Sequence, residues 1–108
     1  MDTFAALADP TRRRILERLG RGERAAGQFV REFAVTAPAI SQHLKVLREA
    51  GLVRVRPDRQ RRLYSLDPAG WAEVDEWLAR MRRFWAGRLD VLARELEQPE
   101  PAKPRRKR

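Results

Sequence analysis

The sequence predicts a mainly α-helical fold with one small β-hairpin, on three observations. Apolar residues recur at helical spacing over most of the chain, and capping residues and glycines separate the helical stretches. Residues 52–56 and 62–66 alternate like strands on either side of a turn-like stretch at residues 57–61. A long apolar stripe follows at residues 68–97.

Two helices are expected in the first 20 residues. Residues 4–8 predict a short first helix, which is interrupted at Pro10. Asp9 then caps a second helix that begins at Pro10 and ends at Gly20. The residues expected to face the core of the protein from this second helix are Ile15, Leu16 and Leu19.

Residues 36–50 predict a helix with two unlike faces. Thr36 caps its first turn, Pro38 costs no hydrogen bond there, and Gly51 ends it. At about 100° per residue, one apolar arc holds Ile40, Leu44 and Leu47, flanked by Ala39, Val46 and Ala50. The opposite side holds Ser41, Gln42, Lys45 and Arg48. One face is therefore core and the other is free.

Another short helix is predicted at residues 26–33, just before this one, with only Ala34 and Val35 between it and Thr36. Two helices joined by so tight a turn make a helix-turn-helix, whose second helix reads bases in the DNA major groove. Gln42 suits adenine, and Ser41 suits a base or a phosphate. The candidate DNA-binding residues of this helix are Thr36, Ala37, Pro38, Ser41, Gln42, His43, Lys45 and Arg48.

His43 is the only histidine of the chain. It falls at the edge of the apolar arc, so both structural packing and DNA contact fit its position.

We call the predicted helix at residues 36–50 the reading helix. The predicted hairpin follows it directly and is rich in arginine. Asp58 is its only acid, and its candidate DNA-binding residues are Arg54, Arg56, Arg59, Arg61 and Arg62. Such a hairpin places guanidinium groups beside phosphates or in a narrow minor groove. The whole pattern therefore predicts a winged helix-turn-helix.

Asp67 and Pro68 start a long helix that extends to about residue 97. Its apolar stripe consists of Trp71, Val74, Leu78, Met81, Trp85, Leu89, Leu92 and Leu96, widened by Trp77 and Phe84. We expect the first three to serve the protomer's own core. A helix of roughly 45 Å is too long for this core to cover, so the remainder needs a second copy of the chain. The candidate dimer-interface residues are Phe4, Leu7, Met81, Trp85, Leu89 and Leu92. The aromatic residues of this helix fit plain packing or an apolar ligand pocket.

From residue 4 to residue 96 the chain resembles the ArsR family of bacterial winged helix-turn-helix repressors. The resemblance is carried by FAALADPTRRRILERL, VTAPAISQHLKVLREAGLV and RRLYSLDP. The segment DEWLARMRRFWAGRLDVLARELE is similar to the branch that includes autorepressors without a metal sensor. The resemblance implies a homodimeric regulator, dimeric through its N- and C-terminal helices, that binds double-stranded DNA at a palindromic operator. The family's DNA-reading positions map to Ala37, Pro38, Ser41, Gln42, His43, Lys45, Arg59 and Arg61. Ala37 departs from the polar or basic residue expected there.

Composition narrows the function further. With no cysteine and one histidine, the usual zinc or arsenite site cannot be assembled within one protomer, so we expect no metal response and no cofactor.

We expect one domain over residues 1–98 and a disordered basic tail over residues 99–108, which contributes +4 of the net charge of +9. The chain shows no signal peptide and no membrane span, so a cytoplasmic location is expected. The sequence does not indicate which small-molecule effector, if any, the protein binds.

Three rival functions compete with operator binding. An enzyme is disfavoured because the chain has no glycine-rich phosphate loop and no cysteine nucleophile. A winged-helix protein-interaction module has the same core, but does not need the polar reading face or the arginine-rich wing. A protein that coats DNA through charge alone would bind every sequence equally.

Overall fold

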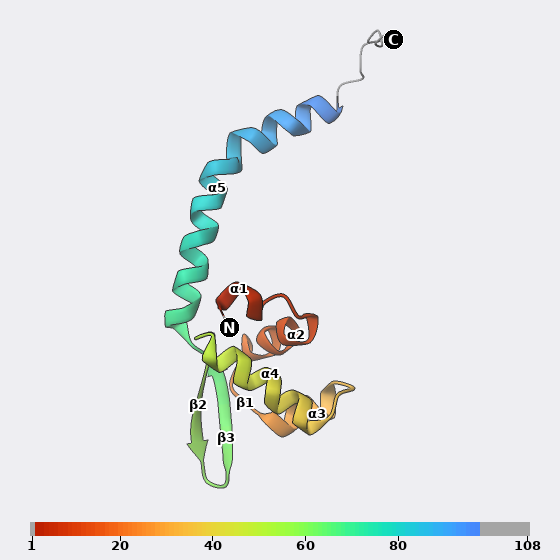
Figure 1. The fold of residues 1–108 in the computed structure, drawn as a ribbon, viewed down its shortest axis with the longest axis vertical. Helices are drawn as coiled ribbons and strands as arrows, with labels where there is room; N and C mark the ends of the chain where they lie inside the picture. Colours follow the sequence, from red (N-terminus) through yellow and green to blue (C-terminus); the bar gives the residue numbers. More distant parts are fainter. Residues whose placement is uncertain (1, 98–108) are drawn as a thin grey trace. The chain divides into compact units, whose positions relative to one another are not determined.

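The computed structural model describes residues 2–97, which fall into two compact units that divide after Asp75. The tail expected at residues 99–108 lies outside the described residues, as does residue 98. The helices are α1 (Thr3–Ala6), α2 (Pro10–Leu19), α3 (Ala26–Glu32), α4 (Ala37–Glu49) and α5 (Pro68–Glu97) (Figure 1). The strands are β1 (Arg24–Ala25), β2 (Val53–Asp58) and β3 (Arg61–Leu66).

The helix starts follow the predicted caps. Asp9 Oδ1 accepts the backbone N–H groups of Thr11 and Arg12 at 2.8 and 3.1 Å, and Thr36 Oγ1 accepts that of Ala39 at 3.3 Å. The first helix ends at Ala6, earlier than predicted. Pro10 has no N–H group to donate to the Ala6 carbonyl oxygen four residues before it, and Arg12 Nε donates to this oxygen instead at 2.7 Å.

The hairpin is longer in its strands and shorter in its turn than the sequence predicts. Pro57, Asp58 and Arg61 belong to the strands, and only residues 59–60 form the turn. Arg59 makes this tight turn possible by adopting a positive φ of 62°. Sequence reasoning also missed β1, a two-residue strand that pairs with β3 and gives the sheet the order β1-β3-β2.

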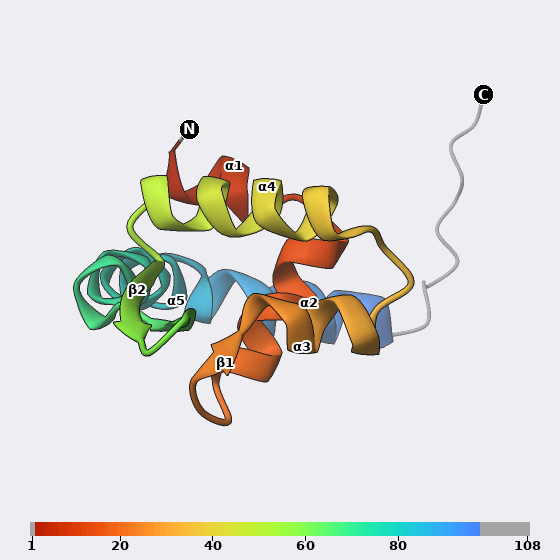
Figure 2. The same ribbon diagram turned by 90° about the horizontal axis from the view of Figure 1, so that it is seen from below.

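One apolar core lies in the unit that ends at Asp75. Its cluster includes the predicted residues of α2 and the apolar face of α4, and Phe29 and Phe33 of α3 pack ring against ring at 5.7 Å. Val74 is buried in this core and Trp71 packs against it, as predicted. Figure 2 shows α4 lying next to α1 and across α2 and α3, so one side of α4 is covered.

The end of α4 is the point at which α1 and the first turn of α5 meet it. Gly51 has a positive φ of 82°, and a Cβ added to Gly70 would lie 1.8 Å from the Gly51 carbonyl oxygen. Two glycines therefore allow the first turn of α5 to approach the end of the reading helix. Trp71 Nε1 donates to the Leu52 carbonyl oxygen at 3.1 Å, and Thr3 Oγ1 of α1 donates to that of Ala50 at 3.2 Å.

The second unit consists, in its described part, of α5 from Glu76 to Glu97. Leu78, which we expected in the protomer's own core, is 41% exposed and does not belong to the core cluster. The buried part of the stripe therefore ends one helical turn earlier, at Val74. Within residues 2–97, none of the helices combines the length and the apolar character that crossing a membrane requires.

Candidate DNA-binding surface

The polar face of α4 is open along its whole length. Ser41, Gln42, Lys45 and Arg48 are all exposed, whereas Ile40, Leu44 and Leu47 on the other side are at most 1% exposed. Among the described residues, no hydrogen bond or ion pair occupies the side chains of Ser41, Gln42 or Lys45. The helix is thus anchored by one face and offers unpaired donors and acceptors on the other.

The first turn of α4 offers less chemistry. The hydroxyl oxygen of Thr36 already caps the Ala39 N–H group, although its own O–H remains a donor. Ala37 and Pro38 are exposed but carry no side-chain hydrogen-bonding group. A contact of these two residues with DNA would therefore be limited to van der Waals packing, for example against a thymine methyl group.

His43 is half-buried and in contact with the second helix. A guanidinium nitrogen of Arg12 lies 3.4 Å from its Nδ1 atom, and the same guanidinium group donates to the Ala6 carbonyl oxygen. Of the two roles that the sequence allows for His43, the structure places this nitrogen in packing. A contact between its Nε2 atom and DNA stays a prediction.

The register of the hairpin divides the predicted arginines between two faces of the sheet. Residues directly opposite each other on paired strands share a face, and faces alternate along each strand. Arg54, Arg56 and Arg61 therefore lie on one face, with Leu63 opposite Arg56. Arg62 lies on the other face, where it is paired with Pro57. Alternation in the sequence alone does not reveal which face the reading helix approaches.

The fold brings Arg62 of the hairpin to the reading helix. It lines a shallow depression together with Arg48 of α4, and Val55, Arg56 and Pro57 complete the lining. Neither Arg48 nor Arg62 has an acidic partner among the described residues. Two unneutralised guanidinium groups at one depression suit a phosphate group.

Two other wing arginines are already paired. Arg56 donates from Nε and from the outer guanidinium nitrogen to the two carboxylate oxygens of Glu23, at 2.8 and 2.9 Å. These hydrogen bonds hold the pKa of Glu23 below its usual value and raise that of Arg56. Arg61 Nε donates to Asp58 Oδ2 at 3.3 Å. Glu23 was not singled out from the sequence, because it lies 33 positions from Arg56 and precedes a strand too short to recognise.

Arg59 occupies the tip of the wing. Its φ of 62° lies in the left-handed region, which costs an L-residue with a long side chain about 1–2 kcal/mol. Arg59 is exposed with Asp58, Gln60 and Arg61 around it, and it has no ion pair with the described residues. An exposed cation is thus held at a backbone position that glycine would fill without strain.

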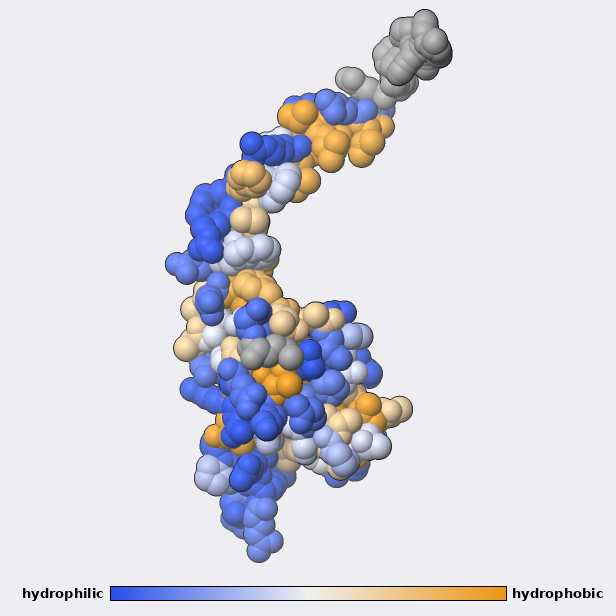
Figure 3. All heavy atoms as spheres, viewed as in Figure 1, coloured by the Kyte–Doolittle hydropathy of each residue, from blue (hydrophilic) through white to orange (hydrophobic). Residues whose placement is uncertain are grey.

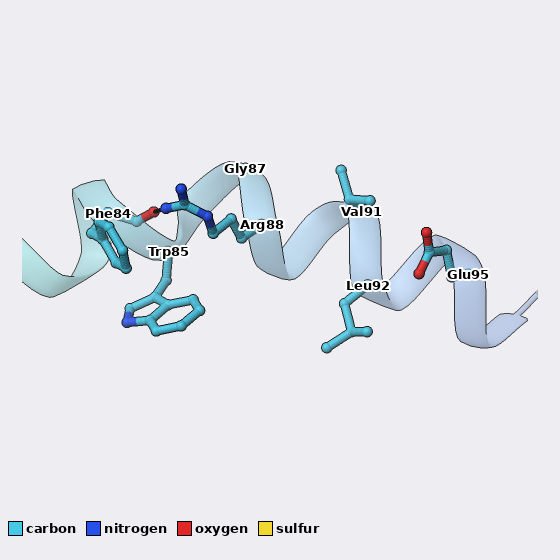
Figure 4. Close-up of a pocket in the computed structure, with 7 residues that line it drawn as sticks. All are labelled: Phe84, Trp85, Gly87, Arg88, Val91, Leu92 and Glu95. Carbon is cyan, nitrogen blue, oxygen red and sulfur yellow. Dashed lines mark hydrogen bonds between the residues drawn. The ribbon is translucent and has the colours of Figure 1, made fainter.

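The apolar stripe of α5 is uncovered beyond Met81. Trp85, Leu89 and Leu92 are 44%, 57% and 50% exposed, and Figure 3 shows hydrophobic side chains gathered along this part of the helix. In Figure 4, Trp85 and Leu92 point to one side of the helix and Val91 points to the opposite side. Phe84 packs edge-on against Trp85. The guanidinium carbon of Arg88 lies 4.3 Å from the centre of the Phe84 ring. The exposed surface is therefore wider than a single stripe.

The candidate interface residues near the N-terminus differ in exposure. Phe4 is 42% exposed, whereas Leu7 is half-buried and packs against the protomer's own core. Leu7 also lines an apolar groove with Leu16, Leu66 and Trp71. Phe4 is thus the more exposed of the two, and Leu7 packs against the protomer's own core.

Within residues 2–97, no three side chains of the histidine, cysteine, aspartate or glutamate type come together as a candidate metal site. The arrangement of the described elements is that of a winged helix-turn-helix: α3 and α4 form the motif, and β2 and β3 form the wing.

Comparisons with known proteins agree with this class. Residues 7–56 match the family described as "Helix-turn-helix domain". The chain is similar to the HTH-type transcriptional regulator Rv2034 of Mycobacterium tuberculosis, with 50% identity over 80% of this chain and 78% of the relative. It is also similar to the transcriptional repressor SdpR of Bacillus subtilis, with 34% identity over 71% of this chain and 86% of the relative.

A solved structure described as "ArsR family transcriptional regulator, RHA00566" superposes with a TM-score of 0.69 at 31% identity, covering 77% of this chain and 91% of the other. The chain belongs to the ArsR family of winged helix-turn-helix transcriptional regulators. It is a DNA-binding transcriptional regulator and not an enzyme.

Proposed function

We propose that the protein represses transcription by binding a palindromic operator as a homodimer, with one α4 helix in the major groove of each half-site. The observation that carries this proposal is the open polar face of α4, whose opposite face is buried. In this proposal Gln42 reads a base, by preference adenine, and Ser41 and Lys45 contact base edges or phosphates next to it. His43 contributes its Nε2 atom.

The wing supplies contacts to the sugar-phosphate backbone. A phosphate lies between Arg48 and Arg62, because both guanidinium groups line one depression beside the reading helix. Arg59 extends from the wing tip toward the minor groove. Arg54 and Arg61 add charge on the other face of the hairpin. These contacts fix the protein on the duplex and carry little sequence information.

A second copy of the chain covers the exposed stripe of α5. Large apolar side chains at Trp85, Leu89 and Leu92 are each at least 44% exposed, which is unfavourable for a protein that remains a monomer. Phe4 and Met81 belong to the same proposed interface, and Leu7 supports it from the core. A twofold dimer that places its two reading helices about 34 Å apart matches successive major grooves on one side of B-DNA. Acting on the chromosome, such a repressor works in the cytoplasm.

DNA binding is tested with fragments from upstream of the protein's own gene. Fluorescence anisotropy at one fixed salt concentration compares these fragments with random DNA of equal length. We expect at least one upstream fragment to bind about 10³-fold more tightly than random DNA. Equal displacement by every competitor would indicate a DNA-coating protein, and no binding to any DNA would indicate a protein-interaction module.

The dimer is tested by placing charges on its proposed interface. Leu89→Lys combined with Leu92→Lys should give a monomer by analytical ultracentrifugation and a much weaker operator complex. Asp90→Lys is the matched control, since about 100° per residue turns this exposed position away from Leu92. A double variant that keeps the dimer mass would contradict the proposed interface.

A further inference from the structure

The ion pair between Glu23 and Arg56 crosses the width of the small sheet. Glu23 directly precedes β1, Arg56 lies in β2, and β3 runs between these two strands. Both guanidinium-to-carboxylate hydrogen bonds are below 3 Å, which is the two-pronged geometry that arginine also makes with a phosphate. The Arg56 fork is therefore occupied by an internal anion.

Leu63 shows what lies beneath the ion pair. It is 8% exposed, yet it does not belong to the main core cluster. The register places Leu63 of β3 between Ala25 of β1 and Arg56 of β2, on the same face of the sheet. The Arg56 side chain must pass over this face to reach Glu23. Leu63 is thus positioned to pack against the methylene groups of Arg56, as cross-strand neighbours on one face of a sheet do.

We propose that Glu23 withholds Arg56 from DNA and so limits the affinity of the wing for DNA of any sequence. This inference rests on the proposed function, in which the wing lies against the phosphate backbone. A phosphate that binds Arg56 must first displace the Glu23 carboxylate and then lie near its negative charge. Arg62 meets no such obstacle, because no acidic partner holds it within the described part of the chain.

The charge around Glu23 supports the same reading. Besides Arg56, the positive charge of Arg54 contributes to the lowered pKa of Glu23, so this carboxylate interacts with two arginines that share one face of the wing. Replacing Glu23 by a neutral residue removes a negative charge and releases a guanidinium group. Both effects favour an additional phosphate contact.

The experiment measures affinity for random duplex DNA over a range of salt concentrations. Glu23→Gln should bind about three to ten times more tightly near 0.1 M salt, with a salt slope steeper by up to about one. Glu23→Ala, which cannot accept any hydrogen bond from Arg56, should show the same change. The double variant Glu23→Gln with Arg56→Gln has the net charge of the natural protein and should return to its affinity and slope.

Two results would overturn the inference. An unchanged or weaker affinity of both Glu23 variants would mean that Glu23 only braces the wing. A flatter slope in the double variant would mean that Arg56 already contacts a phosphate. Arg62→Gln, measured in parallel, should flatten the slope; its failure to do so would count against the proposed role of the wing. Thermal unfolding confirms that each variant is folded before its binding is compared.

Discussion

A guanidinium nitrogen of Arg12 lies 3.4 Å from Nδ1 of His43, so the reading helix is tied by a polar contact to the second helix of the fold. Arginine has donors only, and Nδ1 must therefore be the acceptor in this contact. In the neutral ring the proton is then carried by Nε2. The contact fixes which nitrogen of His43 remains available as a donor to DNA.

We predict that the neutral His43 ring has an unprotonated Nδ1 atom. Because His43 is the only histidine of the chain, a long-range ¹H–¹⁵N spectrum recorded above pH 8 reports on it without ambiguity. Arg12→Gln should reduce the population of this tautomer. Arg13→Gln is the matched control, since Arg13 donates to the Leu7 carbonyl oxygen instead. A spectrum showing a protonated Nδ1 atom in the neutral ring would refute the assignment.

Gly70→Ala should destabilise the fold by about 2–4 kcal/mol in the free energy of unfolding, measured by urea denaturation. The added Cβ would lie 1.8 Å from the Gly51 carbonyl oxygen, and this clash is with backbone, which cannot rotate away. Gly87→Ala provides the control, because nothing lies within 4 Å of a Cβ at that position in the same helix. That change should be stabilising by up to about 1 kcal/mol. Equal effects of the two changes would contradict the close approach of Gly70 to Gly51.

Arg59→Gly should raise stability and lower DNA affinity at once. Glycine relieves the cost of about 1–2 kcal/mol at the positive φ of 62°, and its larger loss of backbone entropy on folding offsets part of this, for a net gain of about 0.5–1 kcal/mol in the free energy of unfolding. The same change removes the proposed contact near the minor groove, so the salt slope of binding should flatten by up to about one. Gln60→Gly, at the other turn residue, should leave binding unchanged. A wing-tip glycine variant with natural DNA affinity would show that Arg59 makes no contact.

We predict that Glu32 makes the free energy of unfolding depend on pH in the acidic range. A side-chain hydrogen bond from Arg18, helped by the charges of Arg18, Arg24 and Arg14, lowers the pKa of Glu32 from its ordinary value of 4.5. A lowered folded-state pKa contributes stability that is present above pH 4.5 and is lost as the pH falls through the folded-state value.

The measurement compares the free energy of unfolding of the natural protein with that of Glu32→Gln from pH 7 downward. The natural protein should be the more stable at pH 7, and the difference should shrink as the pH falls below 4.5. Glu49→Gln, at an exposed position without an ion pair among the described residues, should show no such trend. A constant difference for Glu32→Gln across this range would exclude the ion pair as its cause.

Most of the architecture follows from local signals in the sequence. The caps at Asp9 and Thr36 and the stop at Gly51 mark the helices, because each satisfies backbone groups that only a helix end leaves free. The apolar faces of α2 and α4 are buried as predicted. The prediction for Leu78 was wrong, because a continuous apolar stripe does not reveal at which residue the helix leaves the protomer's own core.

The candidate site is only partly readable from the sequence. The open face of α4 follows from helical periodicity, but the pairing of Arg56 with Glu23 depends on β1, which has two residues and no period to detect. The sorting of Arg54 and Arg62 onto opposite faces depends on the strand register, which is set by a turn of two residues where five were expected. Long-range pairing and register are tertiary properties, and composition does not encode them.

The most direct test of the account is the base specificity of Gln42→Ala, measured on an operator and on its single base-pair variants at one salt concentration. We predict that this variant loses discrimination at one or two base pairs, by roughly 1–3 kcal/mol each, while its affinity for random DNA is unchanged. Arg62→Gln, in contrast, should weaken all sequences similarly. Equal losses on operator and random DNA for Gln42→Ala would contradict the claim that α4 reads the operator through this residue.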